Sequence, residues 1–140
     1  MADARVLLDE QYPADSRCVG LARRAAGEAA RSAGLPEERT WDMMLAVSEA
    51  VTNAVVHGFV GRKHPGHVGI RAEAREGEIV VTVEDDGIGP RPRTDSPGLG
   101  LGLPTIAAVA ATMDVRHLDG NGTQLCFSFP LGSKAYGAAA

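Results

Sequence analysis

Apolar residues recur every three or four positions along much of the first sixty residues, which is the spacing of amphipathic helices. A first helix is expected from Asp15 to Ala33, in a stretch rich in alanine and arginine. Asp15 or Ser16 suits its N-cap, because a short polar side chain can accept a hydrogen bond from the first amides. Gly34 suits its end, because glycine tolerates the left-handed conformation that often terminates a helix.

A second helix is expected from Pro36 to about Gly58. Proline is tolerated in a first helical turn, where its missing N–H would have no partner anyway. The apolar residues at helical spacing are Trp41, Met44, Leu45, Val47, Val51 and Val55. Val47, Val51 and Val55 mark the stripe that we assign to the core.

The rest of the chain shows the shorter patterns of strands, with one more helix. Strands are predicted by alternating polarity or by runs of β-branched residues at 4–8, 67–74, 78–84, 114–118 and 123–129. A third helix is expected from about Leu103 to Met113. This order predicts an α/β two-layer sandwich, in which three helices cover one face of a mixed, largely antiparallel sheet. We expect a single domain over residues 1–140, with its core at about 5–130.

The composition is that of an ordinary globular chain, with 44% hydrophobic and 23% charged residues. The net charge of −4 argues against non-specific binding to nucleic acid, which needs a basic surface. No apolar run approaches the ~20 residues that cross a bilayer, and the first residues lack the pattern of a signal peptide. Cys18 and Cys126 have no metal-ligand or redox-pair spacing. We therefore expect free thiols and a cytoplasmic protein that binds neither nucleic acid nor membrane.

The first candidate motif lies on the second helix and reads SEAVTNAVVHG, residues 48–58. Glu49, Asn53 and His57 are four positions apart, so they lie along one face of the helix, away from the valine stripe. An amide oxygen can ligate magnesium, and a carboxylate can accept a proton or orient a nucleophile. On these residues alone, a solvated polar stripe explains the pattern equally well.

The second motif reads EDDGIG, residues 84–89, and directly follows a strand. Glycines let the backbone approach a flat ligand closely, and a buried carboxylate at a strand end can accept a hydrogen bond from an amine such as that of adenine. Taken alone, this motif is explained more simply by an Asp-Gly turn.

The third motif reads GLGLGL, residues 98–103, and precedes the third helix. Amides at a helix N-terminus form an anion site that suits phosphate. A proline-rich stretch precedes the motif and no Walker lysine follows it. These two features argue against a dinucleotide fingerprint and against a P-loop.

Together and in this order, the motifs resemble those of the GHKL ATPases, which include gyrase, Hsp90, histidine kinases and MutL. SEAVTNAVVHG is similar to the N box, EDDGIG and GLGLGL to the two glycine boxes, and Gly122-Thr123 to the final small box. Within the superfamily, the chain is most similar to the stand-alone anti-sigma-factor serine/threonine kinases of bacteria. These begin with a short strand and an arginine-rich helix and carry the phrase SEAVTNAV-HG. The resemblance covers about residues 5–130 and implies the GHKL fold and ATP binding.

The resemblance also implies roles for individual residues. Asn53 would coordinate a magnesium ion, and Glu49 would act as general base or orient the attacking hydroxyl. Asp85 would bind the adenine amino group, and Thr123 would support it through water. The remaining residues would shape the pocket and meet the phosphates: Gly87, Gly89, Gly100, Leu101 and Gly102.

Partners follow from the same resemblance. Such kinases bind a sigma factor and phosphorylate a serine or threonine of an antagonist, the anti-anti-sigma protein, and related kinases commonly act as homodimers. Four arginines of the first helix either present a basic face to an acidic partner or are simply solvated: Arg17, Arg23, Arg24 and Arg31.

The chain departs from this family at Pro90–Pro97. Only these eight residues separate Gly89 from Gly98, where anti-sigma kinases usually have a longer lid over the triphosphate. The short segment favours an alternative function, in which the chain binds nucleotide only as a structural ligand and regulates a partner protein stoichiometrically.

Overall fold

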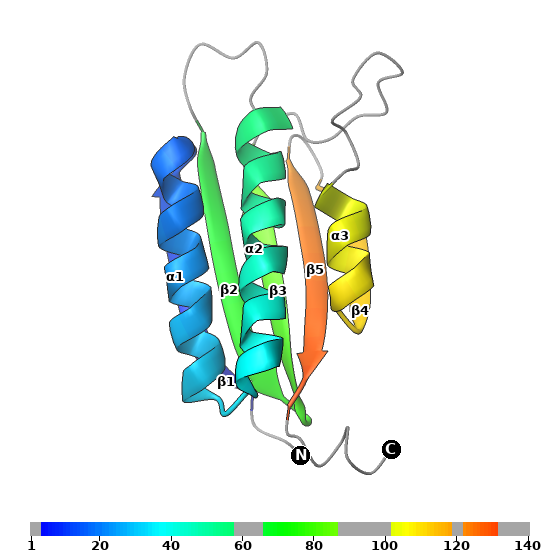
Figure 1. The fold of residues 1–140 in the computed structure, drawn as a ribbon. Coiled ribbons are helices and arrows are strands. Elements are labelled where there is room, and N and C mark those ends of the chain that lie inside the picture. The colour runs from blue at the N-terminus through cyan, green and yellow to red at the C-terminus, as the bar shows by residue number, and fades with distance from the viewer. Residues whose placement is uncertain (1–3, 58–65, 87–101, 119–121, 132–140) are drawn as a thin grey trace.

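The computed structural model describes residues 4–57, 66–86, 102–118 and 122–131. In these ranges the chain forms one sheet with three helices on one of its faces (Figure 1). In chain order the elements are β1 (Arg5–Pro13), α1 (Ser16–Ser32), α2 (Glu37–His57), β2 (His67–Arg75), β3 (Glu78–Asp85), α3 (Gly102–Val109), β4 (Thr112–His117) and β5 (Thr123–Pro130). The predicted two-layer α/β sandwich is confirmed.

The strands lie in the order β1-β2-β3-β5-β4, and each of the four neighbouring pairs is antiparallel. The expectation of a mixed sheet was therefore wrong for the described strands. β4 follows a crossover through α3 and runs in the same direction as β3, but β5 lies between them. Insertion of β5 replaces the parallel contact with two antiparallel ones.

The core lies between the helices and the covered face of the sheet. Every second residue of the central strands faces it, as the two-residue repeat of a strand requires. The buried strand residues are Val68, Ile70, Ala72, Ile79, Val81, Val83, Leu125, Phe127 and Phe129. On α2, Val47 and Val51 are fully buried, which confirms the predicted stripe, and Val55 is partly buried.

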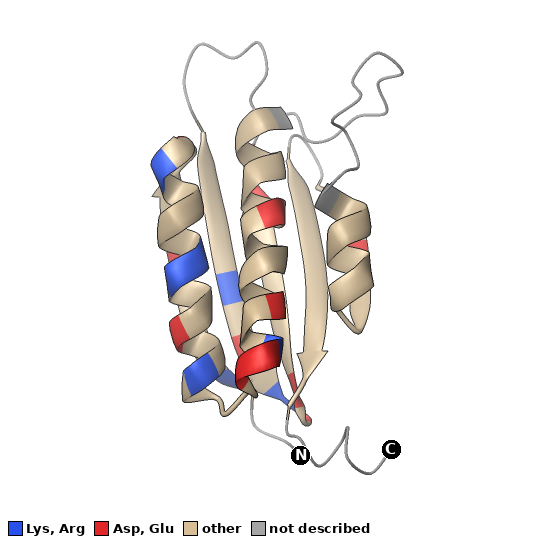
Figure 2. Cartoon of the chain, viewed as in Figure 1, with Lys and Arg blue, Asp and Glu red and all other residues tan. Residues whose placement is uncertain are grey.

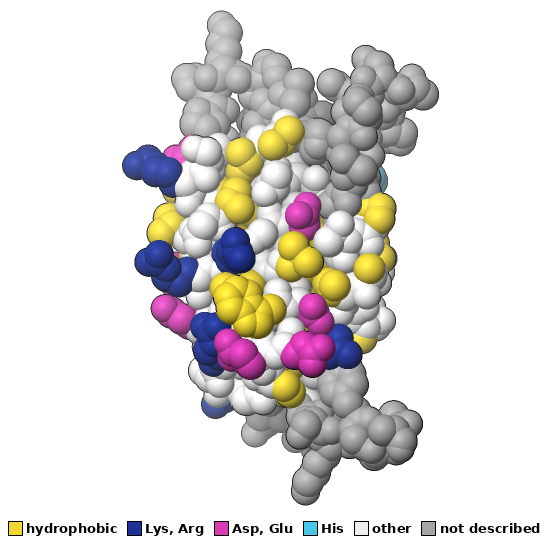
Figure 3. All heavy atoms as spheres, in the orientation of Figure 1, with side chains coloured by type: hydrophobic (Ala, Val, Ile, Leu, Met, Phe, Trp, Pro, Cys, Tyr) yellow, Lys and Arg dark blue, Asp and Glu magenta, His cyan; other side chains and the backbone are white. Residues whose placement is uncertain are grey.

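Two apolar residues of α2 lie on its outer side instead. Trp41 is 51% exposed and Leu45 is 41% exposed, although both recur at helical spacing with the buried valines. The positions that face the sheet beside them are filled by Thr40, Met43 and Ala46, all of which are fully buried. In Figure 3, which views the helix side, hydrophobic side chains are visible along α2 and basic ones gather over α1.

Both ends of α1 follow from the residues that the sequence pattern identified. The N-cap is Asp15 rather than Ser16, and its carboxylate accepts a hydrogen bond of 2.9 Å from the amide of Arg17. At the other end, Gly34 has φ +85°. The amide of Leu35 donates to the carbonyl of Ala30, and the amide of Gly34 donates to the carbonyl of Arg31. This pair of bonds is the Schellman motif, which satisfies carbonyls that the helix leaves free.

Two predicted boundaries differ from the structure more than the others do. β1 continues to Pro13 rather than ending at residue 8, because its second half pairs with β2 through residue 67. α3 ends at Val109 rather than Met113, because Thr112 and Met113 pair with β5. In both places contacts with a distant strand decide the local conformation, which propensity alone does not reveal.

Both cysteines are free, as expected. Cys18 is buried on α1, and burial raises the pKa of its thiol. Cys126 is partly exposed on β5, where the hydroxyl of Thr82 lies 3.9 Å from its sulfur. The Cys18 thiol therefore stays protonated near neutral pH and is the less reactive of the two.

Two glycines of this region should respond to alanine in opposite directions. Gly20 is exposed inside α1 with open space around its Cα, so Gly20→Ala should raise the free energy of unfolding by about 1 kcal/mol. Gly34→Ala forces a residue with a side chain into the left-handed region and should lower the free energy of unfolding by about 1 kcal/mol. Urea unfolding followed by circular dichroism measures both, and shifts of the same sign would contradict the helix end described above.

Candidate functional site

The elements that carry the predicted motifs meet at one end of the sheet. The C-terminal end of α2, the last residue of β3, the first residue of β5 and the start of α3 all lie there (Figure 1). α2 packs across the middle of the sheet and beside α3. The fold therefore brings together segments that lie far apart in the sequence.

Glu49 and Asn53 lie one turn apart on the last turns of α2, and both are partly buried. Their side of the helix differs from that of the fully buried Val47 and Val51, as the spacing predicted. The neighbouring hydroxyl of Ser48 donates a 2.9 Å hydrogen bond to the carbonyl of Met44. Ser48 is therefore engaged within the helix, whereas the side chain of Asn53 makes no hydrogen bond within the described residues.

Asp85 and Thr123 form a polar end to the apolar core. On β3, Ile79, Val81 and Val83 face the helices, and Asp85 is the next residue in that row. Thr123 lies directly opposite Asp85 in the pairing of β3 with β5. Asp85 is only 8% exposed and Thr123 only 5%. Ligand pockets combine an apolar lining with a few polar groups, and a buried polar pair at the end of a core row fits that description.

The hydroxyl of Thr123 is the clearest sign of such a role. Its Oγ1 atom is buried and has no hydrogen-bond partner among the described residues. A buried hydroxyl without a partner costs about 1–3 kcal/mol, which a bound ligand or an ordered water recovers. Beside the Asp85 carboxylate, this hydroxyl fits the edge of a nucleotide base, held directly or through water.

Gly122 explains how Thr123 comes to lie opposite Asp85. Gly122 has φ +122°, and a Cβ atom at this position would lie 2.3 Å from the carbonyl oxygen of Asp85. Only glycine allows the start of β5 to approach the end of β3 so closely. In the Gly122-Thr123 pair, which resembles the final small box, Gly122 thus makes a close backbone contact and Thr123 provides a buried hydroxyl.

The two acidic residues of the second motif have different environments. Asp86 is exposed, and its Oδ1 atom accepts a 2.9 Å hydrogen bond from the amide of His67. Asp86 therefore fixes the start of β2, while Asp85 faces the core. The sequence Asp-Asp alone gave no signal for this division, which follows from the alternation of β3.

The glycine-rich motifs lie largely outside the described residues. Gly87, Gly89, Gly100 and Leu101 belong to this group. Gly102 is described as the first residue of α3, and the start of that helix lies at the same end of the sheet as Asp85. The anion site expected at this helix start remains a prediction.

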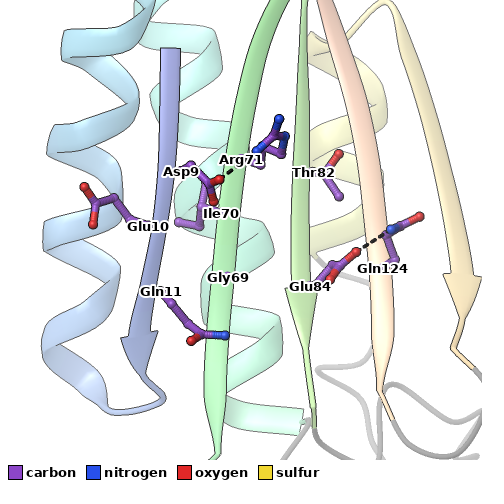
Figure 4. A pocket seen from close by; sticks show the side chains of 9 residues that line it. All are labelled: Asp9, Glu10, Gln11, Gly69, Ile70, Arg71, Thr82, Glu84 and Gln124. Carbon is purple, nitrogen blue, oxygen red and sulfur yellow. Dashed lines mark hydrogen bonds and ion pairs between the residues drawn. The ribbon is translucent and has the colours of Figure 1, made fainter. Parts of the chain in front are cut away.

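A separate hollow of about 580 Å³ lies on the sheet face that the helices leave open. Its lining includes none of the predicted site residues (Figure 4). Within it, Arg71 contacts Asp9 at 2.6 Å, and Gln124 donates to Glu84. Since none of the residues that line it belongs to the predicted site, the hollow is distinct from the candidate site.

Two further features of the described ranges bear on the site. No group of three or more His, Cys, Asp or Glu side chains there is arranged to hold a metal ion. Among the helices in these ranges, none combines the length and apolar character needed to cross a membrane.

Comparison with known proteins agrees with this arrangement. Residues 12–129 match the family described as the histidine kinase-like ATPase domain. An anti-sigma F factor of Clostridium novyi is 34% identical over 99 residues, which are 63% of this chain and 68% of that protein. The serine-protein kinase RsbW of Listeria innocua is 36% identical over 77 residues, which are 55% of this chain and 48% of that protein.

Solved structures share the fold. A histidine kinase domain from Erythrobacter litoralis superimposes with a TM-score of 0.60 at 28% identity, covering 86% of this chain and 62% of that one. The RsbU and RsbW domains of a Mycobacterium tuberculosis protein superimpose with a TM-score of 0.64 at 20% identity, covering 89% of this chain and 34% of that one.

A methyl group at Gly122 should disrupt the site. Gly122→Ala places Cβ against the Asp85 carbonyl and should lower the free energy of unfolding by about 2 kcal/mol or more. Gly69→Ala is the matched control on β2, because its Cβ would meet only the Glu10 carbonyl at 4.0 Å. Urea unfolding of both variants tests the contact, and equal midpoints for the two would show that Gly122 is not constrained.

Proposed function

Because the chain belongs to the histidine kinase-like ATPase domain family, we propose that it is a cytoplasmic ATP-binding regulator with its pocket at the Asp85–Thr123 end of the sheet. The observation that carries the proposal is the buried, unpartnered hydroxyl of Thr123 opposite the buried Asp85. An apolar core that ends in a buried carboxylate and a buried hydroxyl suits a flat base with hydrogen-bonding groups along one edge.

In this proposal, Asp85 and Thr123 select adenine. The carboxylate of Asp85 accepts a hydrogen bond from the exocyclic amine, and Thr123 contributes its hydroxyl through a water molecule. A base that lacks the amine would lose this hydrogen bond to the carboxylate, which gives a basis for discrimination. Gly122 supports the pair by keeping the two strand ends in contact.

The phosphates and magnesium would lie toward α2 and the start of α3. Asn53 offers an amide oxygen of the kind that magnesium accepts, and its side chain has no hydrogen bond within the described ranges. Since no acidic cluster is present in those ranges, the remaining ligands of the ion would be phosphate oxygens and water. Gly87, Gly89, Gly100, Leu101 and Gly102 would meet the phosphates through backbone amides. Bound magnesium would neutralise charge on the phosphates.

We further propose that the chain is an anti-sigma factor and a serine/threonine kinase. Two relatives support this, since one is named an anti-sigma F factor and another a serine-protein kinase. The phosphoryl group would pass from ATP to a serine or threonine hydroxyl of an anti-anti-sigma protein, leaving ADP. Glu49 would accept the proton of that hydroxyl or orient it, and catalysis would depend on positioning. A homodimer is part of the same proposal.

ATP binding can be tested by calorimetric titration in the presence of magnesium. We expect Asp85→Asn to weaken binding by at least about tenfold, because the buried acceptor is altered. Asn53→Ala should weaken it only when magnesium is present, so that wild type and variant converge when the ion is chelated. Thr52→Ala, an exposed neighbour on the same helix, is the control. A wild type that binds no ATP would refute the pocket.

Phosphoryl transfer can be tested with radiolabelled ATP and a purified anti-anti-sigma protein from the same organism. We expect Glu49→Ala to bind ATP normally and to lose transfer by about a hundredfold or more, as for a general base. Glu38→Ala, on the exposed first turn of the same helix, should transfer at the normal rate. Unimpaired transfer by Glu49→Ala would refute its role.

The short Pro90–Pro97 segment supports a second function, stoichiometric regulation of a partner with ATP as a structural ligand. The same assays separate the two functions. ATP binding and sigma-factor binding by a wild type that transfers no phosphate would favour this alternative.

A further inference from the structure

β1 forms one edge of the sheet, and α1 lies alongside it. In the described part of the chain, β1 pairs only with β2. An edge strand leaves a row of backbone N–H and C=O groups unpaired on its outer side. The chain returns from β1 through residues 14 and 15 into α1, which lies near this edge (Figure 1).

A hollow of about 440 Å³ lies between this strand and this helix. We call it the β1–α1 groove, and its lining consists of Val6, Leu7, Leu8, Asp9, Glu10, Ala25, Glu28, Ala29 and Ser32. Its apolar part is made of buried or partly buried residues, including Leu7, Leu8 and Ala29, while Val6 is 49% exposed. The strand edge and the helix thus form two walls beside a small apolar floor.

The charged groups of the groove are all acidic. Neither lysine nor arginine lines it, whereas Asp9, Glu10 and Glu28 do. Asp9 is paired with Arg71, at 2.6 Å, on the open face of the sheet. Figure 4 shows Glu10 pointing away from that pair, toward the side of α1.

Glu10 and Glu28 have no hydrogen bond or ion pair within the described residues. The nearest cation along the helix from Glu28 is Arg31, which is attracted to Glu28 through space but donates its hydrogen bond to Glu37, at 2.9 Å. Figure 2 shows that basic residues otherwise predominate along α1. Glu10 and Glu28 are both exposed, and because neither has a hydrogen bond or ion pair in the described ranges, both can contact an external cation.

We propose that the β1–α1 groove binds an extended, basic segment of a partner protein. The segment pairs with β1 as an additional strand, lays small apolar side chains over Leu7 and Ala29, and places lysine or arginine near Glu10 and Glu28. Strand addition beside a helix is an established mode of peptide recognition, in which backbone bonds provide affinity and side chains provide specificity. Since β1 residues 6–10 line the groove, a segment of similar length, about 17 Å when extended, fills it.

A second copy of this chain suits the edge less well. Pairing β1 with β1 around Glu10 would bring the Glu10 side chains of the two copies together, and like charges on facing strands destabilise a sheet. The register shift between Val6 and Leu8 also twists this edge, which limits indiscriminate pairing. A basic partner segment would instead bring opposite charges together.

The test uses the full chain and a short, end-capped, fluorescent peptide that alternates lysine and valine. We expect binding, measured by fluorescence anisotropy, that weakens as salt is added. Glu28→Lys and Glu10→Lys should each weaken it by about five-fold or more, since each replaces an attraction with a repulsion. Asp114→Lys, on the opposite edge strand β4, is the charge-matched control and should bind normally. A peptide of glutamate and valine should not bind.

Methylation of the peptide backbone separates strand pairing from simple charge attraction. Methyl groups on one alternate set of amides should abolish binding, while methyl groups on the other set should leave it intact, because only one set faces β1. Equal binding by both methylated peptides, or equal losses for Glu28→Lys and Asp114→Lys, would overturn the proposal. Absence of binding by a wild type that still binds ATP would also overturn it, independently of the nucleotide pocket. Self-association that Glu10→Lys changes would assign the edge to a second copy instead.

Discussion

The pairing of β3 with β5 is the constraint on which the rest of the structure depends. β3 is the middle strand of the sheet, and its register against β5 places Asp85 opposite Thr123. A shift of one residue would turn every side chain of one strand to the other face, exposing the apolar row and separating the polar pair. The close contact of Gly122 with the Asp85 carbonyl fixes this register at the end where the candidate site lies. The pairing of β3 with β5 therefore determines both the packing of the core and the arrangement of the candidate site.

α2 connects the core to the site in a similar way. One side of the helix buries Val47 and Val51 against the sheet, and another carries Glu49 and Asn53 to the end where Asp85 lies. Because a helix is rigid over these few turns, the packing of the valines determines where the polar side chains lie. The same element thus contributes stability and the proposed ligand for magnesium, with no need for a flexible segment to position Asn53.

Much of the fold could be predicted from the sequence, because its signals are local. The capping residue Asp15, the terminating Gly34 and the valine stripe of α2 each act within a few residues. The predicted boundaries were wrong where pairing with a distant strand determines the local conformation. One such place is the second half of β1, which pairs with β2. The other is the end of α3, where Thr112 and Met113 pair with β5. At the site, spacing placed Glu49 and Asn53 on one side of a helix, but the separate environments of Asp85 and Asp86 depend on the alternation of β3. The acidic groove beside β1 had no local signal, because its two walls come from different elements.

The insertion of β5 between β3 and β4 also has a consequence for the order of folding. Asp85 and Thr123 are neighbours in the sheet but distant along the chain, and the segment between them contains α3 and β4. Closing so long a loop costs conformational entropy that hairpins such as β2–β3 and β4–β5 do not incur, so the hairpins can form first and the central ladder later. A nascent or partly unfolded chain then has helices and hairpins but lacks the proposed base-binding site, and a nucleotide bound at that site would stabilise only the fully assembled sheet.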